Sequence, residues 1–197
     1  MSTPALIVYS DYVCPYCLLA QGTITQAADR HGVEVDWRPY ELRPAPNPTL
    51  RPEDDYLPRV WAQSVYPMAQ RLGIPITLPS ISPQPYTHTA FEGYQYAREH
   101  GVGTQYHSAV LRAFFQQDKN IGLVDVLTGI ATGLGLDGGE FAAALTDRRY
   151  EQAHQQALAQ ARADVIHAVP TVLVGDYRIE GVPDADRLDA ALSAVRA

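Results

Sequence analysis

Residues 6–17 read LIVYSDYVCPYC, a short run of β-branched and aromatic residues that leads directly into two cysteines. The run Leu6–Tyr9 has the pattern of a strand buried on both faces, and residues 10–12 are of types that form turns and cap helices. From position 14 to about position 30, apolar residues recur at helical spacing, with Pro15 where a first helical turn tolerates proline. The stretch therefore predicts a strand that feeds a helix, with the cysteine pair at the junction.

Strand patterns on either side of this junction extend the prediction to the whole fold. Val33–Leu42 alternates apolar and polar residues with period two, which makes the start of the chain β-α-β. Near the other end, Thr171–Val174 and Tyr177–Glu180 flank a Gly-Asp turn and predict a β-hairpin, followed by a helix over Asp184–Val195. A β-α-β start and a β-β-α end predict an α/β protein with a thioredoxin-like fold.

The middle of the chain has a different character. Eleven of the fifteen prolines fall between Pro39 and Pro85, which excludes long strands there. Within this stretch we expect a helix over Tyr56–Leu72, interrupted at Pro67, between ordered loops. Five further helices are predicted at Thr87–Glu99, Thr104–Gln117, Leu123–Gly133, Gly139–Leu145 and Tyr150–Asp164. The thioredoxin-like domain is thus predicted to comprise residues 1–43 and 165–197, and a mainly helical insertion residues 44–164.

The composition and charge of the chain exclude some classes of protein and argue against some partners. The chain has 197 residues, of which 46% are hydrophobic and 19% charged, which excludes a disordered protein. Its net charge of −7 offers no attraction to phosphate backbones, so we expect no nucleic-acid partner. No run approaches the roughly 18 apolar residues of a membrane helix, and no secretory leader pattern is visible. We therefore expect a soluble, cytoplasmic protein without a membrane partner; the sequence does not set its oligomeric state.

The chain contains only two cysteines, Cys14 and Cys17. A static disulfide across one helical turn would constrain almost none of the unfolded chain, so stability is a poor reason for it. A zinc site usually needs four ligands, and no second cysteine pair or paired-histidine motif accompanies these two, so we expect no metal. Two cysteines separated by two residues beside a β-α-β unit predict redox chemistry.

The predicted position of the cysteines assigns each a role. A sulfur at the first turn of a helix faces unpaired backbone N–H groups, which stabilise the attacking thiolate form of Cys14. Cys17, one turn further on, is expected to resolve the mixed disulfide that forms on Cys14. At the far end of the chain, Pro170 directly precedes a predicted strand, where its missing N–H is acceptable. A cis Val169–Pro170 bond would be a deliberate local feature there.

These residues resemble the DsbA-like thioredoxin-fold dithiol oxidoreductases, in particular their FrnE-like branch. The resemblance spans nearly the whole chain and is carried by residues 9–17, 41–44, 86–101, 106–115 with 118–121, 135–137, and Val169-Pro170-Thr171. It implies that Pro170 is a cis-proline facing the cysteine pair and that the backbone of Val169 pairs with an extended substrate. Pro15, Tyr16 and Thr171 belong to the same motifs and are expected to support the site.

Three further residues are weaker candidates. Relatives often have glycine in the run before Val-Pro-Thr, whereas this chain has His167 there. This histidine either stabilises the Cys14 thiolate as a cation or shuttles a proton, or it is a surface histidine on a loop. In this fold a buried carboxylate often helps to deprotonate the resolving thiol. Glu41 and then Asp11 are the candidates for that role, and the alternative for each is a cap or an exposed charge.

The sequence thus predicts a thiol-disulfide oxidoreductase, acting as reductase, isomerase or oxidase on a protein or small molecule that contains a disulfide or thiol. This chemistry requires no cofactor, although glutathione is a possible thiol reductant or substrate. One alternative is an enzyme similar to glutathione-dependent isomerases or kappa-type glutathione transferases, in which the position of Cys14 is usually serine and the second cysteine is dispensable. Another is a binding module whose disulfide switches a partner surface.

Overall fold

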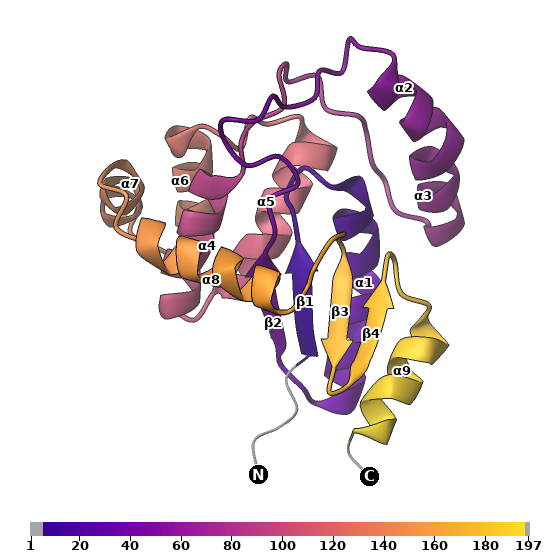
Figure 1. The fold of residues 1–197 in the computed structure, drawn as a ribbon. Coiled ribbons are helices and arrows are strands. Elements are labelled where there is room, and N and C mark those ends of the chain that lie inside the picture. The colour runs from indigo at the N-terminus through magenta and orange to yellow at the C-terminus, as the bar shows by residue number, and fades with distance from the viewer. Residues whose placement is uncertain (1–5, 196–197) are drawn as a thin grey trace.

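The computed structural model describes residues 6–195 and contains a four-stranded sheet at the centre of the molecule (Figure 1). The strands are β1 (Leu6–Ser10), β2 (Val35–Pro39), β3 (Thr171–Val174) and β4 (Tyr177–Glu180), in the order β2-β1-β3-β4. β1 pairs parallel with β2 and antiparallel with β3, and β4 is antiparallel to β3. The predicted thioredoxin-like α/β fold is confirmed, and the hairpin strands have their predicted bounds.

Nine α-helices and one π-helical segment accompany the sheet within residues 6–195. Helix α1 (Pro15–His31) connects β1 to β2, and α9 (Ala185–Ala194) follows β4 and packs against α1. Between β2 and β3 lie the other helical elements: α2 (Tyr56–Val60), η1 (Trp61–Val65), α3 (Tyr66–Leu72), α4 (His88–Glu99), α5 (Gly103–Gln117), α6 (Val124–Gly133), α7 (Gly138–Thr146) and α8 (Glu151–Ala163). Figure 1 shows α2 and α3 at the upper right, apart from α4–α8 at the left.

Burial explains why the first strand and helix form where they do. In β1 the side chains of Leu6, Val8 and Tyr9 are fully buried, as expected of a strand covered on both faces. Helix α1 ends at Gly32, whose φ of +57° is the left-handed conformation that glycine adopts without a Cβ penalty. Strand and helix together fix the direction in which the chain enters α1, and hence the place of the cysteines.

Two elements differ from the sequence prediction. The second strand is Val35–Pro39 rather than Val33–Leu42. It begins later because the Val33 amide closes the end of α1 by donating to Ala28 O, and at the other end the Leu42 amide donates to the Asp11 side chain and not to a neighbouring strand. The helix over residues 56–72 continues through its proline, and the segment before Pro67 becomes π-helical. Pro67 has no amide hydrogen, and the widened turn accommodates the resulting change of hydrogen-bond register.

No helix in the described part of the chain is both long enough and apolar enough to span a lipid bilayer.

Candidate active site

Cys14 is the N-cap residue of α1 and has an extended backbone (φ −92°, ψ 112°), after which Pro15 opens the helix. The Cys17 amide donates to Cys14 O at 3.0 Å, so the two residues bracket the first helical turn. Both cysteines are free thiols, with exposed fractions of only 4% and 1%. The sequence therefore folds into a reduced, sheltered cysteine pair at the amino end of a helix.

The strand order brings a distant segment to Cys14. β3 lies next to β1, and Tyr9 is opposite Thr171 in the antiparallel register. The segment before β3 reaches over the helix start, and Cys14 Sγ donates to Val169 O at 3.4 Å across 155 residues of sequence. The Val169–Pro170 peptide bond is cis, and the Thr171 hydroxyl donates to Ala168 O at 2.7 Å. Of the predicted residues 169–171, Val169 thus contacts Cys14 directly, and Pro170 and Thr171 follow it into β3.

Cys17 points inward beneath Cys14. Its sulfur accepts a hydrogen bond from the Asp11 amide at 3.5 Å. Burial, and next the interaction with Cys14, raise the pKa of the Cys17 thiol well above its ordinary value. Cys17 therefore needs a nearby base before it can attack as a thiolate.

Asp11, whose backbone amide contacts that thiol, also has a fully buried carboxyl group. Burial raises its pKa from 3.8 to about 6, partly offset by the Leu42 amide, which donates to Oδ2 at 2.8 Å. The other oxygen, Oδ1, is buried and has no hydrogen-bond partner within the described chain. Of the two carboxylates that the sequence suggested, Asp11 is the one in direct contact with Cys17, through its backbone.

Glu41 contacts a residue that the sequence analysis missed. Its Oε1 lies 2.5 Å from Nε2 of His154 on α8, and the two side chains are 6% and 0% exposed. His154 falls on the buried stripe of α8 together with Ala161, one helical repeat of seven further on. That spacing was a visible signal for a buried histidine, but nothing in the sequence pointed to Glu41 as its partner.

The remaining candidates lie at the edge of the site. The Tyr16 hydroxyl lies 2.6 Å from the Ser64 hydroxyl of η1, so this residue between the cysteines is tied to the helical part of the chain. His167 is exposed, two residues before Val169, and its role beside Cys14 stays a prediction. Across residues 6–195 no three or more His, Cys, Asp or Glu side chains are grouped so as to hold a metal ion.

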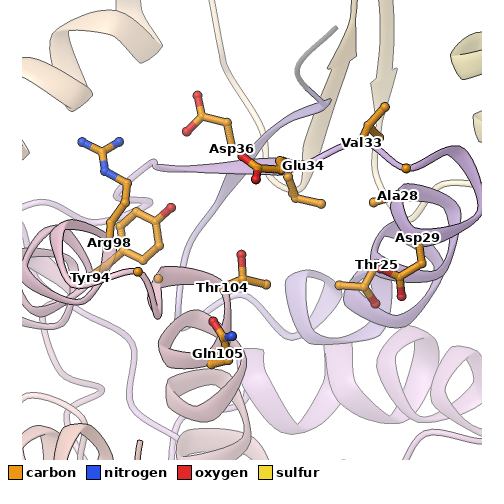
Figure 2. A pocket seen from close by; sticks show the side chains of 14 residues that line it. Thr25, Ala28, Asp29, Val33, Glu34, Asp36, Tyr94, Arg98, Thr104 and Gln105 are labelled. Carbon is orange, nitrogen blue, oxygen red and sulfur yellow. The ribbon is translucent and has the colours of Figure 1, made fainter. Parts of the chain in front are cut away.

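A hollow of about 1030 Å³ lies at the other end of the sheet (Figure 2). Thr25, Ala28 and Asp29 of α1 stand on one side of it, and Tyr94 and Arg98 of α4 stand on the other. It borders the last turns of α1, about 20 Å from the first turn at 1.5 Å per residue. The hollow is therefore separate from the cysteine chemistry.

Comparison with known proteins gives a family match over almost the whole chain. A family model described as a DSBA-like thioredoxin domain matches residues 5–196. The uncharacterised protein YwbO of Bacillus subtilis (strain 168) is 45% identical over 188 residues, which cover 94% of each chain.

Several solved structures share the fold at low sequence identity. A probable DsbA oxidoreductase of Streptomyces coelicolor superposes with a TM-score of 0.79 at 22% identity, covering 98% of this chain and 90% of its own. A 2-hydroxychromene-2-carboxylate isomerase gives 0.75 at 19% identity, covering 98% and 94%. The cytosolic disulfide reductase DsbM of Pseudomonas aeruginosa gives 0.73 at 19%, covering 96% and 97%, and a second structure of it contains glutathione.

Proposed function

Since the chain belongs to the DSBA-like thioredoxin domain family, we propose that it is a thiol-disulfide oxidoreductase whose reacting groups are Cys14 and Cys17. One observation carries this proposal: two free thiols lie on the first turn of α1, and the outer sulfur touches the backbone carbonyl of Val169. Helix N-terminal N–H groups stabilise a thiolate at that position.

The proposed reaction proceeds through a mixed disulfide. The Cys14 thiolate attacks one sulfur of a substrate disulfide, and the first substrate thiolate leaves. Cys17 then loses its proton, attacks Cys14 Sγ and displaces the second substrate thiolate. Two electrons pass from the cysteine pair to the substrate, and the two cysteine protons end on the two substrate thiols. The products are a Cys14–Cys17 disulfide and a reduced substrate.

Asp11 is the proton acceptor that we propose for the second step. Its carboxyl group is buried, its backbone amide contacts the Cys17 sulfur, and a pKa near 6 leaves the carboxyl group ionised at neutral pH yet basic enough to take a proton. The inward position of Cys17 supports this role, since bulk water does not reach a thiol that is 1% exposed.

The substrate is proposed to pair with the backbone of Val169 as an extended segment, with Pro170 packed against the cysteine pair. Support comes from Val169 itself, whose carbonyl already accepts a hydrogen bond from Cys14. We propose no resident cofactor. A thiol of the glutathione class would return the disulfide to the dithiol, two such thiols being oxidised to one disulfide, and the glutathione-containing structure of DsbM supports this choice.

We further propose the reducing direction and a cytoplasmic location. Likeness to a cytosolic disulfide reductase supports both, and the family motifs at residues 9–17 and 169–171 support membership of the FrnE-like branch. Whether the natural substrate is a protein or a small molecule, we propose that it carries an accessible disulfide or thiol.

Two single substitutions test the function. Cys14→Ser is expected to reduce the rate on an aromatic disulfide such as DTNB to the uncatalysed rate, because the attacking sulfur is gone. Cys17→Ser is expected to accumulate a covalent adduct on Cys14, visible as an added mass, because no thiol resolves it. Full activity in Cys14→Ser would contradict the proposal.

A second candidate is favoured by one comparison, the shared fold of the 2-hydroxychromene-2-carboxylate isomerase. A glutathione-dependent isomerase or transferase would need neither thiol, so its activity would survive both substitutions. A non-enzymatic redox switch would form the Cys14–Cys17 disulfide but would not turn over a disulfide substrate. The same variants therefore separate the three functions.

A further inference from the structure

The contact between Glu41 and His154 joins the end of β2 to the helical part of the chain, 113 residues further on. Both side chains are almost wholly buried, and Nε2 and Oε1 lie 2.5 Å apart. A buried carboxylate is costly unless a hydrogen bond or an opposite charge compensates it. His154 supplies both when its ring is protonated.

The ring of His154 is fixed in place. It stacks on Phe91 of α4 with centroids 5.6 Å apart and an interplanar angle of 12°. Nε2 faces Glu41, whereas Nδ1 is buried and has no hydrogen-bond partner in residues 6–195. A His154 ring that carries protons on both nitrogens compensates the charge of the Glu41 carboxylate, whereas a ring with one proton donates a hydrogen bond without compensating that charge.

The other charged or titratable groups around this pair are either compensated by an opposite charge or neutral near pH 7. Glu92 on α4 is fully buried and accepts from Arg148 Nε at 2.9 and 3.0 Å, so these two opposite charges compensate each other. His88 on α4 faces the same cluster, and burial lowers its pKa, so it is neutral at pH 7. In this cluster Glu41 is thus the carboxylate whose partner is a histidine, while the partner of Glu92 is an arginine.

Glu41 is close enough to Asp11 to influence it. Its neighbour Leu42 donates its amide to Asp11 Oδ2 at 2.8 Å. Burial is the main cause of the raised pKa of Asp11, and the charge of Glu41 adds to it. The Tyr12 phenol also interacts with the charge of Asp11, and burial raises its pKa well above its ordinary value. Burial likewise raises the pKa of the Cys17 thiol, which contacts the backbone amide of Asp11. An uncompensated charge on Glu41 would therefore act directly on Asp11.

We propose that His154 is a positioning residue of the cysteine site: it holds and neutralises the Glu41 carboxylate and so sets the pH above which Asp11 accepts the proton of Cys17. This inference rests on the proposed function. It gives the helical part of the chain a defined chemical influence on the resolving step, exerted through Glu41 and Asp11 rather than by contact with the substrate.

The resolving step can be followed separately from the attacking step. When the reduced protein reacts with DTNB, the first thionitrobenzoate released reports attack by Cys14, and the second reports attack by Cys17. In His154→Gln, the amide still donates to Glu41 but carries no charge. We expect the pH midpoint of the second phase to rise by about one pH unit, as for a unit charge at an effective dielectric constant near 20. Below the midpoint that phase becomes about tenfold slower, and the first phase keeps its pH profile.

The double variant Glu41→Gln with His154→Gln provides the decisive comparison. Removing the carboxylate removes the charge that the histidine compensated, so the midpoint is expected to return to the wild-type value or below it. A purely structural role for His154 would not be reversed by a second substitution. An unchanged midpoint in His154→Gln, or a double variant no closer to wild type than the single one, would overturn the proposal.

His107→Gln is the matched control. His107 is also a buried histidine on a helix between β2 and β3, but it stacks on Trp37, and burial lowers its pKa to about 3. It is therefore already neutral over the pH range of the assay, and its replacement should leave the midpoint of the second phase unchanged. A midpoint that moves equally in His107→Gln and His154→Gln would show that general disturbance of the interior is the cause.

A second measurement does not require His154 to be replaced. Coupling between sites is reciprocal, so Asp11→Asn should lower the pH at which His154 loses its Nδ1 proton, as read from histidine nitrogen NMR signals. An unshifted His154 titration would contradict the coupling. Failure of the proposed function is distinct: wild-type protein would then release no second thionitrobenzoate, or Asp11→Asn would leave the second phase unaltered.

Discussion

Burial of the Asp11 carboxyl group lowers the stability of the folded protein near neutral pH, and the same burial raises its pKa into the range that suits a proton acceptor. An aspartate that must ionise inside the protein loses its hydration, and the Leu42 amide and the surrounding dipoles replace only part of it. In the folded protein the group keeps its proton up to about pH 6, whereas in the unfolded chain it releases it near pH 3.8. Its contribution to stability is therefore full below pH 3.8 and is lost as the pH rises to about 6.

The variant Asp11→Asn tests this loss of folding stability. At pH 7 we expect the free energy of unfolding to rise by up to about 3 kcal/mol, since each unit of pKa difference corresponds to about 1.4 kcal/mol. Near pH 3.5 the two proteins should be almost equally stable, because Asp11 is then protonated. Urea unfolding at several pH values measures both.

A control for this series is Asp29→Asn, since Asp29 is exposed. Because this side chain is exposed, we expect Asp29→Asn to change the free energy of unfolding at pH 7 much less than Asp11→Asn does. Equal destabilisation by Asp11→Asn at both pH values would instead mean that the carboxyl group makes a favourable contact that the asparagine lacks.

Residue-level prediction from sequence succeeded where the determinants are local. The N-terminal position of Cys14 on a helix follows from the residues immediately around it, and so do the bounds of the hairpin strands Thr171–Val174 and Tyr177–Glu180. The Glu41–His154 contact could not be predicted, because it depends on how α8 is placed against β2 in space. Helical spacing shows that a side chain is buried, not which distant side chain it meets.

At the scale of elements, the predicted helices have the observed bounds to within one residue in the region from α4 to α8, because each is delimited by glycine or by capping residue types. The segment around Pro67 differs from the prediction of an interrupted helix. A proline in the sequence shows that one backbone hydrogen bond is lost, but it does not show whether the helix stops there or continues with a different hydrogen-bond register. Here Tyr66 N–H donates to Trp61 O, five residues back, and the helix continues. The widened turn contains Ser64, the residue in contact with Tyr16.

Close packing between helices supplies an element-scale prediction at Gly93 of α4. A Cβ added there would lie 2.8 Å from Phe141 Cζ of α7 and would also collide with the Tyr106 hydroxyl of α5. We expect Gly93→Ala to lower the free energy of unfolding by about 1–3 kcal/mol, the usual effect of overpacking. Denaturant unfolding measures the change.

Gly129→Ala is the corresponding control, because Gly129 lies within α6 and a Cβ there meets nothing within 4 Å. Here the gain in helix propensity should raise stability by up to about 1 kcal/mol. If both substitutions stabilise the protein, the three helices do not approach as closely as described.

For the molecule as a whole, the buried side chains form one cluster that runs from the sheet and α1 into the helices between β2 and β3. The predicted division into residues 1–43 with 165–197 and residues 44–164 describes the order of the chain, and stays a prediction as a statement about independent units. The continuous core favours a molecule that unfolds in a single cooperative step.

The two tryptophans test that expectation, since Trp37 lies in β2 and Trp61 in η1, and both are buried. In Trp61→Phe the fluorescence reports the sheet, and in Trp37→Phe it reports the helical part. We expect each variant to show the same denaturant midpoint by fluorescence as by far-ultraviolet circular dichroism. Different midpoints for the two probes within one variant would establish two units.

The pairing of β1 with β3 also has a consequence for the order of events during synthesis on the ribosome. Cys14 and Cys17 are synthesised about 155 residues before Val169 and β3. Until then the nascent chain carries both thiols without the strand that lies beside them in the folded protein. Contacts of such sequence separation form late and slowly. Folding of this site is thus postponed until β3 has been synthesised, and in the meantime the thiols depend on the surrounding redox conditions for their protection.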